Sequence, residues 1–481
     1  MSPAGSRDAP ADPPGAIARL ALRLTALAER YVPDAFVFAL VATVVVFLLG
    51  RLVAGAKAGE MVDSWGKGFW ELIPFAMQMA LIIITGYVLA SSRPVFWLIA
   101  RLGGAARTPR GATVLVALFS MLTSWINWGF SLIFSAILAR ETARRHPSAD
   151  YRALCAASFL GLGSIWAQGL SGSAALQMAP AGALQPAIRT IVAKGGIVPG
   201  GVVSLAHTIF LWQSLLCVAI EIVVVTAVVF LATPPPGRAR SAADLGIALD
   251  PPPGAATDAA TGARTPGEWL EHQPFLTVLV CALGFVYLGK SVAAAPSKLD
   301  AINVNTINLL FLLVGFALHG TPARLLRAVR EATPAVWGIL LQFPFYAGIA
   351  GMITYTHLNE RIAAFFVHVS SRTTFPPLIA LYSAVLGIFV PSGGSKWVIE
   401  APYVMAAAHD LRVHLGWMVA VYDLGEALAN LVQPFWMLPT LAILGLRARD
   451  VMGFTFLVFL VLLPLVLVLV TVLGTTLPYP L

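Results

Sequence analysis

The sequence predicts an all-α polytopic membrane protein made of two inverted repeats, with re-entrant hairpins and discontinuous helices. The first observation is composition: 58% of the 481 residues are hydrophobic and 11% are charged, whereas a soluble domain has about 25% charged residues. The second is the recurrence of apolar segments near the ~20 residues that cross a bilayer. The third is that polar residues interrupt such segments at corresponding places in the two halves.

The N-terminal region, residues 1–33, is predicted to be a cytoplasmic tail that ends in an amphipathic helix. Residues 1–18 are polar and rich in Ala and Pro. Residues 19–31 place three arginines among Leu and Ala, a pattern typical of a helix that lies at the membrane interface.

The first repeat is expected over residues 34–232 and the second over residues 304–475. Between them, residues 233–273 are polar and hold two Pro-Pro-Pro runs, which predicts a flexible cytosolic linker. Residues 274–293 predict one connecting span. Within the repeats, the expected full spans are 34–54, 72–92, 153–180, 203–232, 304–320, 333–355, 417–445 and 451–475.

Two further apolar regions, 112–142 and 376–408, are split by Asn-Trp-Gly and by Pro-Ser-Gly-Gly. Gly and Pro break helices, and freed backbone groups at membrane depth survive only where protein or a polar cavity satisfies them. We therefore predict that both regions are re-entrant hairpins, which enter and leave the membrane on the same side.

The second half repeats features of the first about 264 residues later, at the polar interruptions of apolar segments. Identical residues at this single offset are few, so the evidence for a repeat is their location at the interruptions and not their number. Paired interruptions in two inverted halves indicate the binding site of a secondary carrier. The matched positions are Gln78 with Gln342, Gly161 with Gly425, and residues 125–131 with 389–395.

Lys and Arg predict the orientation of the chain. With the N-terminus in the cytoplasm and the C-terminus outside, the inner loops hold about twice as many Lys and Arg residues as the outer loops, as the positive-inside rule requires. The net charge of +8 is therefore attributed to these loops rather than to a nucleic-acid-binding surface. This layout puts the first hairpin on the cytoplasmic side and the second on the outer side.

The hairpin tips are the candidate substrate site. Each tip precedes a helical arm whose N-terminus offers unpaired N–H groups and a partial positive charge, and glycine lets an anion approach the backbone closely. The alternative is that Gly and Ser only allow tight helix packing. The candidate substrate-binding residues are Asn127, Trp128, Gly129, Ser131, Ser392, Gly393, Gly394, Ser395 and Lys396.

The span after each hairpin is also interrupted, at residues 169–173 and at residues 430–434. Pro434 removes a backbone donor and frees a carbonyl one turn earlier. Such carbonyls, together with Asn and Ser oxygens, suit Na⁺ or a hydrogen-bonded substrate, with Na⁺ expected near Ser171 and Asn430; an ordinary proline kink is the alternative. The candidate ion- or substrate-coordinating residues are Ser171, Gly172, Ser173, Glu426, Asn430 and Gln433.

Four charged residues fall at membrane depth in the second half, where each costs about 2.5–3.5 kcal/mol at a helix centre. Lys396 is expected to pair with one of the acids or with a substrate carboxylate, so a structural ion pair and direct ligation both remain open. Glu426 is the expected proton carrier if H⁺ drives transport. Glu221 looks isolated in its span and receives no role. The four residues are Lys396, Glu400, Asp423 and Glu426.

Motifs for other functions are missing from the sequence. The three cysteines lie far apart and form no Cys-x-x-Cys pair, and neither a His-Glu-x-x-His site nor a P-loop lysine motif is present. We therefore expect no catalytic residue, no metal site apart from the Na⁺ mentioned above, and no cofactor. A membrane-embedded enzyme is the alternative from a different class.

At these residues the chain resembles the short-chain fatty acid transporter family of the AtoE type, over roughly residues 30–455. The matching stretches are Trp65–Trp70, Met77–Ile82, Ile126–Phe130, Gln342–Gly348, Val390–Gly394, Trp397–Ile399 and Gln433–Trp436. Lys396 departs from the family, which more often has His at this position. A permanent cation there is expected to affect which substrate charge is preferred and how transport is coupled.

The resemblance implies membership of the wider ion transporter superfamily, whose members have two inverted repeats and often form dimers with elevator-type motion. It implies a secondary active transporter of short-chain fatty acids or related monocarboxylates, such as acetoacetate or butyrate, coupled to H⁺ or Na⁺. A homodimer in a bacterial-type inner membrane is expected, with a small carboxylate and lipid as partners and no nucleic acid. A Na⁺-coupled dicarboxylate carrier is the alternative within transport.

Overall fold

A computed structural model describes residues 15–31, 35–71, 73–179, 189, 192, 201–249, 265–294, 304–390 and 393–481. These residues form helices and no strands, which confirms the all-α prediction for this part of the chain. The α-helices are α1 (Ala16–Tyr31), α2 (Ala35–Leu49), α3 (Ala58–Glu71), α4 (Ile73–Ser91), α5 (Arg93–Gly103), α6 (Pro109–Ile126), α7 (Trp128–Arg145), α8 (Tyr151–Leu160), α9 (Ser173–Met178), α11 (Trp212–Ala232), α12 (Pro266–Glu271), α13 (Pro274–Ala294), α14 (Val304–His319), α15 (Pro322–Ala332), α16 (Trp337–Tyr355), α17 (Leu358–His368), α18 (Phe375–Phe389), α19 (Gly393–Asp410), α20 (Leu415–Ala429), α21 (Leu438–Leu444) and α22 (Ala448–Gly474).

Five of the described helices are long and apolar enough to cross a membrane: α6, α11, α13, α16 and α22. A sixth span is obtained if α4 and α5, which are bent by 82° at Ser92, count as one. The sequence predicted α6 to be one arm of a re-entrant hairpin, whereas its 18 residues also meet the length of a full span. The hairpin therefore stays a prediction.

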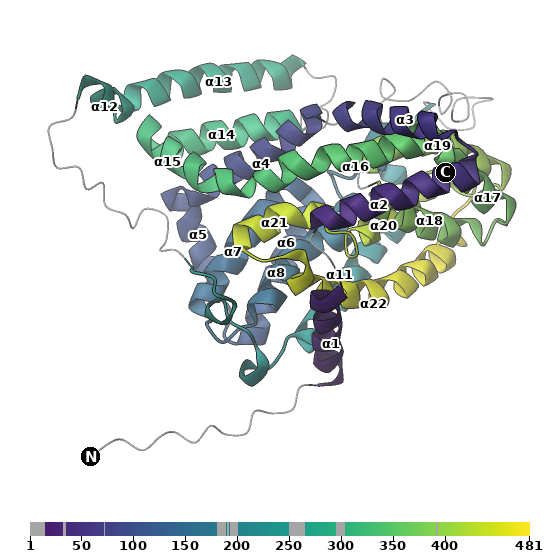
Figure 1. Cartoon of the computed structure of the whole chain (residues 1–481), viewed down its shortest axis with the longest axis horizontal. Helices are drawn as coiled ribbons and strands as arrows, with labels where there is room; N and C mark the ends of the chain where they lie inside the picture. Colours follow the sequence, from purple (N-terminus) through teal and green to yellow (C-terminus); the bar gives the residue numbers. More distant parts are fainter. Residues whose placement is uncertain are drawn as a thin grey trace.

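One group of helices runs side by side across the upper part of Figure 1: α2, α3, α4, α14 and α16. The backbones of α3 and α16 nearly touch, because a Cβ atom on Gly68 would lie 2.7 Å from the Cα of Gly351. Small residues at a helix crossing allow this close approach in membrane proteins. The second group, formed by α6, α7, α8, α11, α18, α20 and α22, contains both predicted interruptions.

The amphipathic helix predicted at residues 19–31 is α1, and it packs on α22. Its buried residues are small or short, including Ala21 and Thr25, and Gly453 of α22 lies directly against Thr25. Its arginines at 19, 23 and 30 are exposed. In Figure 1 this helix stands across the lower edge of the bundle.

The described part of the predicted linker, residues 233–249, folds back onto the bundle. The fully buried carboxylate of Asp150 accepts a hydrogen bond of 3.1 Å from the backbone N–H of Arg240, and the backbone N–H of Tyr151 donates to the Arg240 carbonyl at 2.9 Å. A polar, proline-rich composition predicted flexibility, but it contained no information about this partner on α8. Residues 250–264 of the linker lie outside the described residues.

Candidate functional site

The turn between α6 and α7 is held by the side chains that the sequence assigned to the substrate. Asn127 is the N-cap of α7, and its Oδ1 accepts a hydrogen bond of 2.8 Å from the backbone N–H of Phe130. Ser131 donates from Oγ to the Ser120 carbonyl at 2.8 Å. Gly129 is packed so closely that an added Cβ would lie 2.2 Å from Ile82. These side chains therefore fix the shape of the turn.

The first interruption lies directly against this turn. Helix α8 continues through a π-helix, Gly161–Ile165, and a 3₁₀ turn, Trp166–Gln168, and the chain then stays non-helical until α9 begins at Ser173. The backbone N–H of Leu170 donates to the Trp125 carbonyl at 2.7 Å, and the N–H of Trp128 donates to Ser171 Oγ at 3.0 Å.

Glycine is required at both ends of this interruption. A Cβ on Gly169 would lie 2.0 Å from the Trp125 carbonyl oxygen, and one on Gly172 would lie 2.1 Å from the Ala167 carbonyl oxygen. Because any side chain would collide with the backbone at these distances, Gly169 allows the interruption to meet the turn, and Gly172 allows the interruption to fold back on itself.

A carboxylate from the second half caps α9. Asp423 of α20 is buried, and its two oxygens accept hydrogen bonds of 3.3 Å from the backbone N–H groups of Ala174 and Ala175. The first N–H groups of a helix have no partner within the helix and need an external acceptor. The role of Asp423 in this structure is therefore to close the first-half interruption.

The second interruption, after α20, is closed mainly by its own amides. Gln433 donates from Nε2 to Asn430 Oδ1 at 2.7 Å and accepts at Oε1 from the backbone N–H of Phe435 at 2.7 Å. Asn430 donates from Nδ2 to the Leu162 carbonyl at 3.1 Å. Both side chains are buried. The structure thus brings these two predicted coordinating residues together and joins them to the π-helix of the first half.

Three of the charged residues predicted at membrane depth form one buried network around Tyr422: Lys396, Glu400 and Glu426. Lys396 of α19 makes an ion pair with Glu426 of α20, and its ammonium group also donates to the Ser383 carbonyl at 3.0 Å. Glu400 accepts hydrogen bonds from the hydroxyl groups of Tyr382 at 2.7 Å and Tyr422 at 2.5 Å. Of the two alternatives left open for Lys396, this arrangement corresponds to the structural ion pair.

The second tip lies partly outside the described residues, which exclude Ser392 and the side chain of Ser395. Gly393 begins α19, and the Gly394 carbonyl accepts a hydrogen bond of 3.0 Å from Gln177 Nε2. Because Gln177 belongs to α9, the second tip contacts the helix that follows the first interruption.

Aromatic rings line the region between the two interruptions. The ring centroids of Trp128 and Trp436 are 5.3 Å apart, and Phe435 lies 5.1 Å from Trp436. Helix α16 adds Phe343, stacked on Phe435 at 4.0 Å, and Tyr346 at 4.7 Å from the same ring. Of these rings Trp128 is half-buried and the others are buried, so this aromatic wall can meet a short alkyl chain through Trp128.

The same joint recurs in both halves. Ser120 of α6 donates to the Ser158 carbonyl at 2.8 Å, and Ser383 of α18 donates to the Tyr422 carbonyl at 2.8 Å. Next to these bonds a glycine touches the facing backbone, since a Cβ on Gly161 or on Gly425 would lie 2.2 Å from a carbonyl oxygen.

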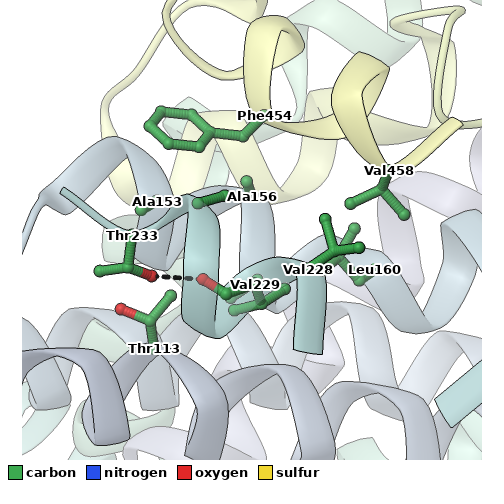
Figure 2. Close-up of a pocket in the computed structure, with 11 residues that line it drawn as sticks. Thr113, Ala153, Ala156, Leu160, Val228, Val229, Thr233, Phe454 and Val458 are labelled. Atoms are coloured by element: carbon green, nitrogen blue, oxygen red, sulfur yellow. Dashed lines mark hydrogen bonds between the residues drawn. The ribbon is translucent and has the colours of Figure 1, made fainter. Parts of the chain in front are cut away.

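A separate small pocket lies among α6, α8, α11 and α22 (Figure 2). Its lining is apolar apart from two threonines, and Thr233 donates its hydroxyl hydrogen to the Val229 carbonyl at 2.7 Å. No residue of the tips or the interruptions lines it, so it is distinct from the candidate site. Within the described ranges, no cluster of three His, Cys, Asp or Glu side chains is arranged to hold a metal ion.

Sequence reasoning missed the contact of Glu221 with Gln168. Both residues are buried, and both carboxylate oxygens of Glu221 lie 3.1 Å from Gln168 Nε2. The available signal was that Gln168 directly precedes the interruption at Gly169, while Glu221 is the one acid in an apolar span.

Comparisons with known proteins agree with the resemblance found in the sequence. The family model described as short chain fatty acid transporter matches residues 16–473. A provisionally named short-chain fatty acid transporter of Escherichia coli (strain K12) is 37% identical over 91% of this chain and 96% of its own length. A protein of the same provisional name from Haemophilus influenzae is 35% identical over 91% of this chain and 96% of its own length.

Among solved structures, the YdaH transporter of Alcanivorax borkumensis is similar with a TM-score of 0.45 and 15% identity, over 93% of this chain and 99% of that chain. This similarity is too distant to support an argument about the present chain.

Proposed function

Because this chain belongs to the short-chain fatty acid transporter family, we propose that it is a secondary active carrier of small monocarboxylates, such as acetoacetate or butyrate, driven by an H⁺ or Na⁺ gradient. It is a multi-pass membrane protein of a transporter family. The observation that carries the proposal is that two interrupted helical segments and the α6–α7 turn meet along one aromatic wall.

In this proposal the substrate carboxylate lies between the two tips, near Gly129 and Gly393, where helices of 18 residues begin. Helix N-termini stabilise anions through backbone N–H groups and the helix dipole. Asn127 and Ser131 act as positioning residues, because their side chains hold the turn. Asn430 and Gln433 hold the second interruption in the same way.

The aromatic wall and the charge network both favour one carboxylate over two. Trp128, which is half-buried, offers apolar surface to the substrate's alkyl chain, and the buried rings of Trp436 and Phe435 pack behind it. A second carboxylate would need another cation, and Lys396 is already paired with Glu426. Exposing a second charge to this wall without a partner would be costly, which argues against the dicarboxylate alternative.

The proposal includes two inverted repeats, an elevator-type motion, a homodimer and an inner-membrane location with the N-terminus in the cytoplasm. The matching joints at Ser120 and Ser383 support a repeat. Cysteines placed near Arg144 should be labelled only from the cytoplasm and cysteines near Arg372 only from outside. Labelling of both from one side would rule out the inverted layout.

Counterflow in proteoliposomes tests the transport function. Vesicles loaded with unlabelled butyrate should take up labelled butyrate faster than protein-free liposomes, which report permeation of the undissociated acid. Competition should come from other C2–C6 monocarboxylates and not from succinate. Equal rates in vesicles with and without protein would exclude the proposed function, and strong inhibition by succinate would favour the dicarboxylate carrier.

A further inference from the structure

Among the residues that the structure describes, the buried acid Glu221 in the middle of α11 has no cation beside it. Its side chain is 1% exposed, and its recorded polar partner is Gln168, which is 6% exposed. The three buried acids of the second half each have a cation or at least two hydrogen-bond donors beside the carboxylate. Glu426 has Lys396, Asp423 has two backbone N–H groups, and Glu400 has two tyrosine hydroxyls.

With Glu221 ionised, the hydrogen-bond donors and acceptors of Glu221 and Gln168 do not match in number. The Gln168 amide nitrogen carries two hydrogens, yet three oxygens lie within reach: both Glu221 oxygens at 3.1 Å and the Ser164 carbonyl at 3.3 Å. At the same time, the amide oxygen of Gln168 is buried and accepts no hydrogen bond within the described part of the chain. An ionised carboxylate and an unpaired amide oxygen side by side are both costly in a low-dielectric interior.

One added proton corrects this mismatch. A protonated Glu221 has an O–H donor, which can be given to the Gln168 amide oxygen while the amide nitrogen donates to the other carboxyl oxygen. The two groups then form a neutral pair with two hydrogen bonds. The step adds one proton to one carboxylate oxygen, and no other bond is made or broken.

Within the described part of the chain, the ionisable side chain that lies near Glu221 is the buried thiol of Cys217, one turn away on the same helix. The π-helix Gly161–Ile165 has no ionisable residue. The ionisable residues of α6 and α22 stand at the C-terminal end of α11, where Arg110 contacts Phe230 and where Phe454, near the start of α22, lines a pocket with Val229. Helix α1 packs at that same end of α22. The ionisable residues of these helices are Arg110, Arg449, Asp450, Arg19, Arg23, Glu29, Arg30 and Tyr31.

The pair is placed to act on the substrate region. Gln168 is followed directly by Gly169, whose neighbours bind the α6–α7 turn: Leu170 to the Trp125 carbonyl and Ser171 to the N–H of Trp128. A change in the hydrogen bonds of the Gln168 side chain therefore acts on the interruption directly, because Gly169 is the next residue.

From this arrangement we propose that Glu221 is the site where the carrier binds its coupling proton, and that protonation favours substrate binding through Gln168 and the first interruption. The proposal rests on the proposed function and selects H⁺ as the coupling ion. It assigns to Glu221 the proton-carrying role that was expected of Glu426, because Glu426 is neutralised by Lys396.

Butyrate binding to the detergent-purified full chain, measured between about pH 6 and about pH 8, tests the proposal. Butyrate stays ionised in this range, because carboxylic acids ordinarily titrate near about pH 4. Linked uptake of one proton predicts that affinity falls by up to about tenfold per pH unit as the pH rises. Glu221→Gln should bind butyrate with an affinity that does not change with pH.

Two further variants serve as controls. Cys217→Ala removes a buried side chain one turn away and should keep the wild-type pH slope, and Glu221→Asp should keep a slope because it still titrates. A wild-type slope in Glu221→Gln, or a flat wild-type profile, overturns the inference while leaving the carrier function intact. A wild-type protein that binds no butyrate at any pH instead overturns the proposed function, and the inference falls with it.

If Glu221→Gln does not fold, infrared difference spectra with and without butyrate test whether residue 221 is protonated on binding. The protonated-carboxyl band that appears on binding should change frequency in Glu221→Asp, because the band belongs to residue 221. An identical band in wild type and Glu221→Asp would place the proton elsewhere.

Discussion

The two halves of the chain share a joint but differ in charge. Both join the helix before the tip, α6 or α18, to the helix before the interruption, α8 or α20, with a serine-to-carbonyl hydrogen bond and a glycine contact. The second half places four charged residues around its joint, whereas the first half has apolar residues at the matched positions. The matched pairs are Lys396 with Leu132, Glu400 with Ala136, Asp423 with Phe159, and Glu426 with Leu162.

This difference shows that the backbone contacts are common to both halves, whereas the buried charges around the joint belong to the second half alone. The backbone contacts need only Ser, Gly and close packing, so both halves can build them. The charges serve other purposes: Asp423 reaches across to cap α9 of the first half, and Lys396 neutralises Glu426. The comparison predicts that substitutions in the second half are more damaging than those at matched positions in the first.

The largest effect is expected from Lys396→Met, which leaves Glu426 buried without its cation. Loss of one partner of a buried ion pair costs about 3–5 kcal/mol. Thermal unfolding in detergent should show this loss, and adding Glu426→Leu should recover most of it. The matched first-half change, Leu132→Met, conserves volume and should cost less than about 1.5 kcal/mol. Equal stability of the two single variants would remove the distinction between the halves.

Asp423→Ala should come next, because it leaves the N–H groups of Ala174 and Ala175 without their acceptor. Two unsatisfied donors predict a loss of about 2–4 kcal/mol in unfolding free energy. Asp423→Asn keeps one of the two acceptor oxygens and should recover part of the loss. If Asp423→Asn is as unstable as Asp423→Ala in the same unfolding assay, a single acceptor oxygen does not cap α9.

Gln433→Ala orphans one backbone donor, the N–H of Phe435, and removes the partner of Asn430. A loss of about 1–3 kcal/mol is expected, equivalent to roughly 5–150-fold in substrate binding if the interruption loses its shape. Direct binding of labelled butyrate measures this. Val432→Ala, at the neighbouring position, should bind nearly as the wild type does; normal binding by Gln433→Ala would place the substrate elsewhere.

The smallest effect is expected from Asn127→Ala in the first half, which removes the N-cap of α7. Such a loss typically costs about 1 kcal/mol. Asn127→Asp keeps a capping oxygen and should restore stability and counterflow. A loss larger than that of Lys396→Met would reverse the ranking of the halves.

The sequence located the interruptions because their cause is local. Gly169, Gly172 and Pro434 favour a break because they stand among polar residues of an apolar segment, and the chain is indeed non-helical at residues 169–172 and at residues 431–434. The resemblance to the transporter family is likewise confirmed.

Tertiary partners could not be predicted in the same way. The sequence offered Lys396 several acids and did not single out Glu426, and it gave no sign that Asp423 caps a helix of the other half. Glu221 looked isolated because its partner is 53 positions away. Such pairings depend on how helices cross, which a pattern along one segment does not contain.

The cap that Asp423 provides has a consequence for the order in which the protein is made. The acceptor for Ala174 lies 249 residues further along the chain, so the ribosome releases α9 long before its cap exists. Until α20 enters the membrane, the N-terminal turn of α9 must be hydrated or held by the insertion machinery. We therefore expect a nascent chain halted before α20 to be cut by protease within residues 169–178, where the finished chain resists.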